Sequence, residues 1–309
     1  MDFRERCGVM VEPQEGMDVE VLMEVAELAE RDGYGYFFRS DHLLPTSRSK
    51  GLDSSECWVT LGAMAQRTKK IKFGPMVSPI GWRNPALLAR MACTVDAMAH
   101  GRLQLGLGAG WYQDEYLAHG FEFPDPGTRV KQFHEALEII RPLTQPVGTA
   151  EFAGKHFSAH LGTLPKRARG IHLIVGGRTP SVVRQTATFG DEWNFFTPFP
   201  EKFDSMKAAL EGSGREIEIS RMGPFVVAES EAKLRARLRG EMRKKGATGD
   251  EDAYARTLKK GGWLVGVTDD FVSSVNELRE RGVDKFYFQL WDPAEREQID
   301  FLAGVLKGM

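Results

Sequence analysis

The sequence predicts an α/β fold in which eight parallel strands close into a (β/α)8 barrel. Short runs of β-branched and aromatic residues alternate with longer stretches of helical period, which is typical of parallel strands joined by helical crossovers. The chain has 309 residues, of which 42% are hydrophobic. This length and composition suit one barrel with one or two insertions. An open doubly wound sheet is the alternative for the same pattern.

Helix signals separate the expected strands. Asp18 and Asn84 are expected N-caps, and Gly33 and Gly101 are expected terminators. The pairs Thr179-Pro180 and Thr268-Asp269 repeat the opening signal. The expected strands are 8–11, 34–39, 71–77, 103–107, 171–175, 192–196, 223–227 and 285–290.

Two stretches exceed what a simple barrel within residues 1–309 requires. Residues 151–165 are expected to form a hairpin at the amino ends of the strands, with a structural role. Residues 230–262 are expected to form a charged helical insertion that leaves from the carboxyl ends of the strands. Its glycines make it a candidate lid, and a solvated surface helix is the alternative.

Composition narrows the function classes. A formal net charge of −2 disfavours nucleic acid and anionic membranes as partners. The three cysteines are scattered, with no metal-ligand spacing, so we expect a cytoplasmic protein without a metal site. No charged leader precedes an apolar run, and no apolar stretch approaches the roughly 18 residues of a membrane helix.

A glycine-rich stretch follows the fourth strand. Gly106, Gly108 and Gly110 would let a flat or anionic group approach backbone N–H groups that a Cβ would block. Tight turns are the alternative explanation. The spacing differs from that of a dinucleotide fold, so a classical NAD site is disfavoured.

Two other strand ends carry candidate chemistry. The adjacent Asp41 and His42 could exchange a proton with a substrate oxygen, although a lone strand-end histidine is often structural. Residues 176–180 bring together backbone amides, the Arg178 guanidinium and a capped helix start, which are the groups that bind a phosphate. An ordinary helix cap is the alternative explanation. Trp58, Trp82 and Trp111 could wall a flat ring, and Arg39, Arg83 and Arg178 could hold an anionic tail.

Three motifs together resemble the bacterial-luciferase-like superfamily, and within it the branch that uses the deazaflavin coenzyme F420. They are SDHLL at 40–44, the run from PMVSPIGWRNP to GLGAGWYQDEYLAHG at 75–120, and IVGGRTPSVVRQTATFGDEWN at 174–194. The resemblance extends from about Val9 to Leu290. It implies a TIM barrel of the luciferase-like type and a hydride transfer between the deazaflavin and a small alcohol, aldehyde, ketone or activated alkene.

Two other functions are compatible with this resemblance. An FMN-dependent monooxygenase would need reduced flavin from a separate reductase, and a non-catalytic flavin-binding subunit would need neither His42 nor a lid. The related F420-dependent glucose-6-phosphate dehydrogenases have tryptophan in place of Thr46 and glutamate in place of Trp111, so that sugar phosphate is not assigned. The family also implies a homodimer.

The resemblance carries over to individual residues. It places Asp41 and His42 at the reactive face of the ring as catalytic residues, with Asp41 holding His42 or the nearby backbone. Glu12, Trp111 and Asn194 are the expected substrate contacts. The expected cofactor contacts are Asp41, Pro75, Met76, Val77, Ser78, Gly108, Ala109, Gly110, Asp114, Gly176, Gly177, Arg178 and Thr179, with a bulge, often a non-prolyl cis peptide, at 75–77.

Overall fold

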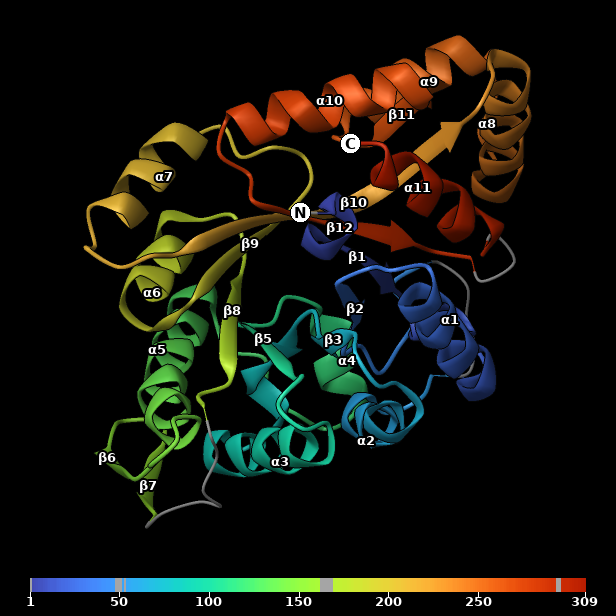
Figure 1. The fold of residues 1–309 in the computed structure, drawn as a ribbon. Helices are drawn as coiled ribbons and strands as arrows, with labels where there is room; N and C mark the ends of the chain where they lie inside the picture. The colour runs from blue at the N-terminus through green and yellow to red at the C-terminus, as the bar shows by residue number, and fades with distance from the viewer. Residues whose placement is uncertain (1, 48–51, 53, 162–168, 293–295) are drawn as a thin grey trace.

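The chain forms a nearly closed parallel barrel with helices on its outside (Figure 1). The computed structural model describes residues 2–47, 52, 54–161, 169–292 and 296–309. Around the barrel the strands follow the order β3-β2-β1-β12-β10-β9-β8-β5-β4, and a bridge between Phe73 and Leu103 joins β3 to the segment that leads into β5. The predicted α/β barrel is therefore confirmed.

The elements alternate along the chain as predicted. The barrel strands are β1 (Cys7–Val11), β2 (Tyr36–Arg39), β3 (Lys72–Pro75), β4 (Ser78–Pro79), β5 (Gln104–Gly108), β8 (His172–Gly176), β9 (Glu192–Phe196), β10 (Glu218–Ala228) and β12 (Lys285–Leu290). The helices are α1 (Val19–Arg31), α2 (Cys57–Arg67), α3 (Pro85–Met98), α4 (Gln113–Ala118), α5 (Pro126–Leu143), α6 (Pro180–Phe189), α7 (Phe203–Glu211), α8 (Glu231–Lys245), α9 (Glu251–Lys260), α10 (Thr268–Glu280) and α11 (Glu297–Lys307). The side chains of Asp18, Asn84 and Thr179 cap α1, α3 and α6 as expected.

Two strand predictions need correction, and one strand was missed. The expected strand 71–77 is divided into β3 and β4, with a cis peptide bond between Met76 and Val77. The expected strand 223–227 is the second half of the longer β10. A further strand, β11 (Leu264–Val267), pairs with β10 in parallel and was missed, because its four residues lie between a double glycine and a helix start.

The barrel interior is filled in layers, because alternate residues of each strand face inward. The middle layer is an apolar cluster of Met10, Tyr36, Phe38, Met76, Ile174 and Tyr287. Charged side chains lie at the amino ends of the strands, where the Lys285 ammonium contacts the Glu192 carboxylate at 2.8 Å. The larger apolar core lies between the strands and the surrounding helices.

Val77 occupies space that three glycines leave open. A Cβ added to Gly106, Gly108 or Gly176 would lie 3.1, 2.7 or 2.9 Å from a methyl group of Val77. The glycines at these strand ends are therefore explained by the close approach of β5 and β8 to the segment between β3 and β4.

Both predicted insertions are present. Residues 151–165 include most of the antiparallel hairpin of β6 (Ala150–Ala153) and β7 (Ser158–Leu161), and positions 162–165 lie outside the described residues. Residues 230–262 form α8 and α9, which pack on β10 and β11 around a separate apolar cluster that includes Val226, Leu234, Leu238 and Leu258. Closure of this segment as a lid stays a prediction.

None of the helices that the structure describes combines the length and the apolar composition needed to cross a lipid bilayer.

We expect Gly108→Ala to destabilise the protein by about 1–3 kcal/mol, because the new methyl group overpacks against Val77. Val77→Ala in the same chain should remove part of this cost, so the double-mutant cycle should show a favourable coupling. Urea denaturation measures both effects. Gly240→Ala is the control, because nothing lies within 4 Å of the added Cβ in α8. Strictly additive free energies for Gly108→Ala and Val77→Ala would contradict the assignment.

Candidate active site

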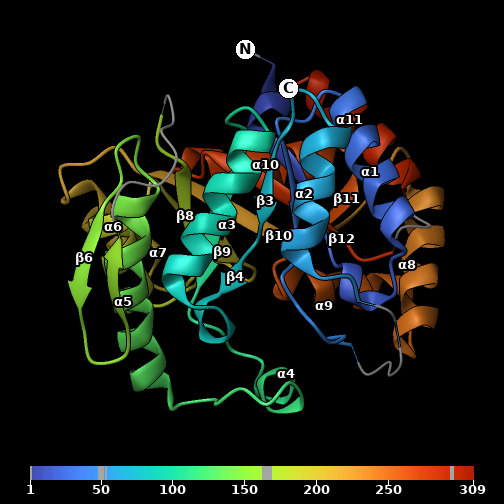
Figure 2. The same cartoon turned by 90° about the horizontal axis from the view of Figure 1, so that it is seen from below.

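The predicted site residues gather at the carboxyl ends of the barrel strands. In Figure 2, α4 lies at one end of the barrel and the N-terminus at the other. The segments that follow β1, β2, β5, β8 and β9 all begin at the end that carries α4. This is the end at which barrel enzymes place their chemistry.

Asp41 is buried and fixed by an ion pair. Its carboxylate accepts hydrogen bonds from the Ser78 hydroxyl at 2.6 Å and from two Arg83 nitrogens at 2.6 and 3.0 Å. Ser78 also accepts a hydrogen bond from the Trp58 indole at 3.0 Å. The hydrogen bonds of Asp41 therefore tie the segment after β2 to β4, and the expectation that Asp41 holds the His42 ring is corrected.

The partner of His42 is Glu115, which comes from α4. His42 Nδ1 lies 2.9 Å from a carboxylate oxygen of Glu115. The other carboxylate oxygen accepts hydrogen bonds from the backbone N–H groups of Leu43 and Leu44. The side chain of Glu115 is only 1% exposed, whereas that of His42 is 19% exposed. One carboxylate thus fixes both the imidazole and the loop that carries it, while Nε2 stays free of this contact.

The environment raises the pKa of His42. Burial alone would lower it, but the hydrogen bond and the negative charge of Glu115 act in the opposite direction and prevail, with smaller contributions from Glu12 and Asp41. The imidazole therefore keeps its proton to a higher pH than an ordinary histidine.

The tryptophans have different positions. The Trp111 side chain is exposed, lies edge-on to the His42 ring at 5.6 Å and stacks on Tyr112 at 5.2 Å. Trp58 and Trp82 are buried, so the expectation that they wall a bound ring is corrected. Asp114 lies exposed on α4.

Glu12 belongs to a buried polar group at the ends of β1 and β12. Its carboxylate accepts hydrogen bonds from the side-chain amides of Gln14, at 2.7 Å, and Gln289. The Ser40 hydroxyl donates to Gln14 at 2.6 Å. The Gln289 carbonyl oxygen and the Trp291 indole nitrogen are buried without a hydrogen-bond partner in the described structure. Orphaned polar atoms at this end of the barrel fit the binding of a polar ligand.

The segment after β8 differs from the prediction at Gly177. Its N–H donates to the Asn194 carbonyl oxygen at 2.9 Å, so this amide is not available to a phosphate. Gly177 has φ +147°, and a Cβ there would lie 2.8 Å from Val182. The Asn194 side chain donates to the Ser220 hydroxyl at 2.8 Å.

The positive charge available to an anion is smaller than predicted. Arg39 is fully buried and bonds to Ser40, Ser55 and Thr60, so its expected contact with an anionic tail is wrong. Arg83 is paired with Asp41 and with Glu56. Arg178 is exposed and contacts the Pro198 carbonyl oxygen at 3.3 Å, next to the start of α6. Arg178 is therefore the predicted arginine that keeps its charge available.

Glu115 was missed by sequence reasoning, which selected its neighbour Asp114. A helix of six residues is too short for its buried face to be read from hydrophobic period. The Asp41–Arg83 pair was also missed, since the two residues are 42 positions apart.

The family comparison gives a direct result. Residues 4–285 match the family model described as luciferase-like monooxygenase. The chain belongs to this family. The superfamily resemblance read from the three motifs is thus confirmed, while the F420-dependent branch stays open because relatives of both kinds match.

The relatives differ in cofactor and reaction. An F420-dependent glucose-6-phosphate dehydrogenase of Amycolatopsis mediterranei is 27% identical over 215 residues, which cover 68% of this chain and 59% of that protein. A pyrimidine monooxygenase of Pseudomonas savastanoi is 27% identical over 268 residues, which cover 81% of this chain and 71% of that protein. The solved structure of an F420-dependent secondary alcohol dehydrogenase has a TM-score of 0.80 at 19% identity, covering 97% of both chains, and supports the fold.

We expect Glu115→Gln to lower the pKa of His42, because burial remains and the opposing charge is lost. NMR titration of the histidine ring protons measures this shift, and the spectrum of His42→Ala assigns the signal. Glu122→Gln, at an exposed position beyond α4, is the matched control. An unchanged His42 titration in Glu115→Gln would exclude the charge of Glu115 as the cause.

Proposed function

We propose that this protein is an F420-dependent oxidoreductase that transfers a hydride between the deazaflavin and a small alcohol, aldehyde, ketone or activated alkene. The observation that carries the proposal is the His42–Glu115 pair, which holds an imidazole of raised pKa at the carboxyl end of β2. Hydride transfer to a carbonyl needs a proton at the developing alkoxide, and a positioned acid supplies it.

The pair explains how the proton is held and released. Glu115 binds Nδ1, which leaves Nε2 of the imidazole to donate to the substrate oxygen. Glu115 is nearly inaccessible, so its charge acts on the imidazole with little screening by water. In the oxidative direction the same nitrogen, once neutral, accepts the proton of the alcohol.

The residues at the carboxyl ends fit a ring with a phosphate-bearing side chain. The exposed Trp111 and the orphaned carbonyl oxygen of Gln289 offer a flat surface and an acceptor. The N-terminus of α6, capped by Thr179, and the exposed Arg178 suit an anionic group. When bound, the deazaflavin supplies the hydride acceptor or donor, and the protein positions it and excludes water.

His42→Ala should lower the rate of the chemical step by roughly 10² to 10⁴, the usual contribution of a positioned general acid. Cofactor affinity should change little, because the proposal assigns His42 to the substrate and not to the cofactor. Single-turnover rates and cofactor dissociation constants on the same preparation test this, with the exposed His134→Ala as control. A variant that loses cofactor but turns over normally when loaded would assign His42 a structural role.

F420 should bind more tightly than FMN, and Arg178→Ala should weaken F420 binding by about tenfold through loss of a charged contact. The salt dependence should be modest, since Arg39 and Arg83 are already engaged. Fluorescence titration with both cofactors measures these affinities, and Arg184→Ala in α6 is the control. Tighter binding of FMN would replace the deazaflavin proposal by the alternative below.

The alternative is an FMN-dependent monooxygenase that receives reduced flavin from a separate reductase. Its support is the length of the match to the pyrimidine monooxygenase, which covers more of this chain than the match to the glucose-6-phosphate dehydrogenase. Oxygen consumption with chemically reduced FMN distinguishes this reaction from hydride transfer. The third function, a non-catalytic flavin-binding subunit, predicts no turnover with either cofactor.

We further propose a homodimer. Exposed apolar side chains of α2 and α3, including Val59, Leu87 and Met98, border a mostly apolar groove that supports such an assembly. The cytoplasmic location likewise stays a prediction.

A further inference from the structure

A polar cavity of about 400 Å³ lies at the amino ends of the barrel strands, opposite the His42 end. Its wall is built by the sheet itself, because six lining residues are the first residues of barrel strands: Tyr36, Lys72, Gln104, His172, Glu218 and Lys285. The proposed function uses none of them.

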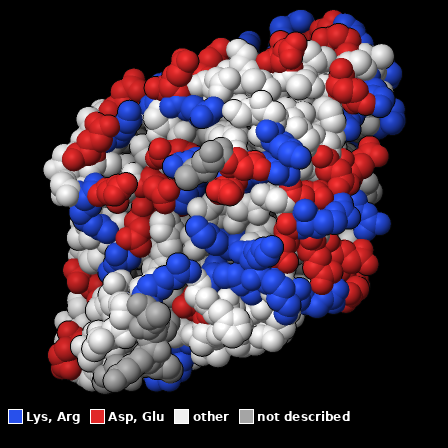
Figure 3. All heavy atoms as spheres, in the orientation of Figure 1, with Lys and Arg blue, Asp and Glu red and all other residues white. Residues whose placement is uncertain are grey.

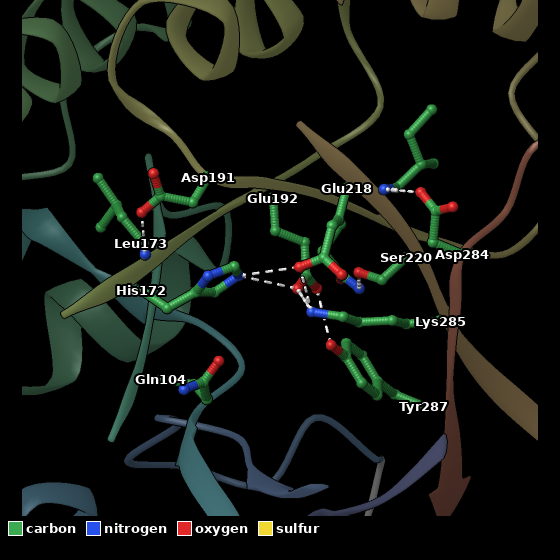
Figure 4. A network of polar contacts seen from close by, with 12 residues as sticks. Gln104, His172, Leu173, Asp191, Glu192, Glu218, Ser220, Asp284, Lys285 and Tyr287 are labelled. Carbon is green, nitrogen blue, oxygen red and sulfur yellow. Dashed lines mark hydrogen bonds and ion pairs between the residues drawn. The ribbon is translucent and has the colours of Figure 1, made fainter. Parts of the chain in front are cut away.

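The floor of the cavity is a charge network that satisfies itself (Figure 4). The Lys285 ammonium lies 2.8 Å from Glu192 and 2.6 Å from Glu218, and Tyr287 donates to Glu192 at 2.8 Å. His172 Nε2 lies 3.1 Å from Glu192. Burial would raise the pKa of Glu192, but Lys285 and His172 outweigh it and hold the pKa at about 2. A divalent cation between His172, Glu192 and Glu218 would have to displace the Lys285 ammonium, so this network is a poor metal site.

The rim of the cavity carries cations that are not compensated. Arg141 forms a bidentate pair with Asp191 at 2.6 and 2.8 Å. Lys72 and Arg169, in contrast, form no ion pair with a carboxylate among the residues that the structure describes. Lys72 lies 5.1 Å from the centre of the Tyr36 ring, and Arg169 donates to the Gly101 carbonyl oxygen.

The surface around the cavity also carries positively charged side chains. Figure 3 views the face that carries the N-terminus and shows Lys and Arg side chains gathered in a band across its middle. The acids that line the cavity, Asp191 and Glu218, are each already paired with a cation. Lys72 at the start of β3 and Arg169 in the segment before β8 both line the cavity, and neither is paired with a carboxylate among the described residues. Two such cations at one polar cavity favour an anion that can bridge them.

We propose that this cavity binds a small polyanion that carries phosphate or carboxylate groups, with Lys72 and Arg169 as its main contacts. The Lys72 ammonium lies over the Tyr36 ring, which also lines the cavity, and the cavity volume suits a ligand of this size. The site is separate from the proposed cofactor site at α6 and does not depend on the proposed function.

Isothermal titration of the full chain with inorganic pyrophosphate and with citrate, at constant ionic strength, tests the proposal. Arg178→Ala is titrated in parallel, because it removes the cation at the start of α6. Lys72→Ala and Arg169→Ala should each weaken binding of the better probe at least tenfold, while Lys70→Ala and Arg184→Ala should not. Arg178→Ala should leave this binding unchanged. The preferred probe identifies the ligand as a phosphate or a carboxylate compound.

Several results would overturn the site. The proposal is wrong if neither probe binds the unsubstituted chain. It is also wrong if binding survives in Lys72→Ala, Lys72→Gln and Arg169→Ala. Loss of binding in Arg178→Ala alone would move the anion to α6. Saturable Mn²⁺ binding that disappears in His172→Ala, without anion binding, would replace the anion site by a metal site. Because Lys72 is exposed, its variants are expected to fold, which circular dichroism verifies.

Discussion

The packing of Val77 against three glycines positions much of the candidate site. Gly106, Gly108 and Gly176 let the segment between β3 and β4 approach its neighbouring strands. The next residue, Ser78, then reaches Asp41, and Asp41 binds Arg83. The contact between the Val77 methyl groups and these glycines thus helps to position the start of the loop that carries His42. Close packing transmits such constraints because protein interiors yield little.

The polar groups at the two ends of the barrel differ in how completely they are paired. At the amino ends, Glu192 has three partners, and its network is complete without a ligand. At the carboxyl ends, Gln289 keeps an acceptor without a partner, and Trp111 is left largely exposed. The apolar middle layer separates these environments. This contrast is the pattern expected when the Glu192 network contributes stability and the carboxyl ends contribute chemistry.

The sequence was sufficient for the barrel but only partly for the site. Strand and helix periods, with the caps Asp18 and Asn84, are local signals, and they located the main barrel strands and the helices that begin at these caps. The contacts of the site are long-range. Nothing near Gly108 in the sequence indicates that Val77 would occupy the space of its Cβ. In the same way, Arg39 reads as a strand-end cation until its burial beside Thr60 is known.

The packing of the segment 230–262 is separate from the main core. Its helices share an apolar cluster that is distinct from the main core, and its end is tied to the barrel where the buried Arg221 donates to the Gly262 carbonyl oxygen at 2.7 Å. Substitutions at the helical positions of that cluster should act mainly on the packing of α8 and α9, because the two sets of buried residues are separate. This part of the protein can therefore change its sequence with little effect on the stability of the barrel.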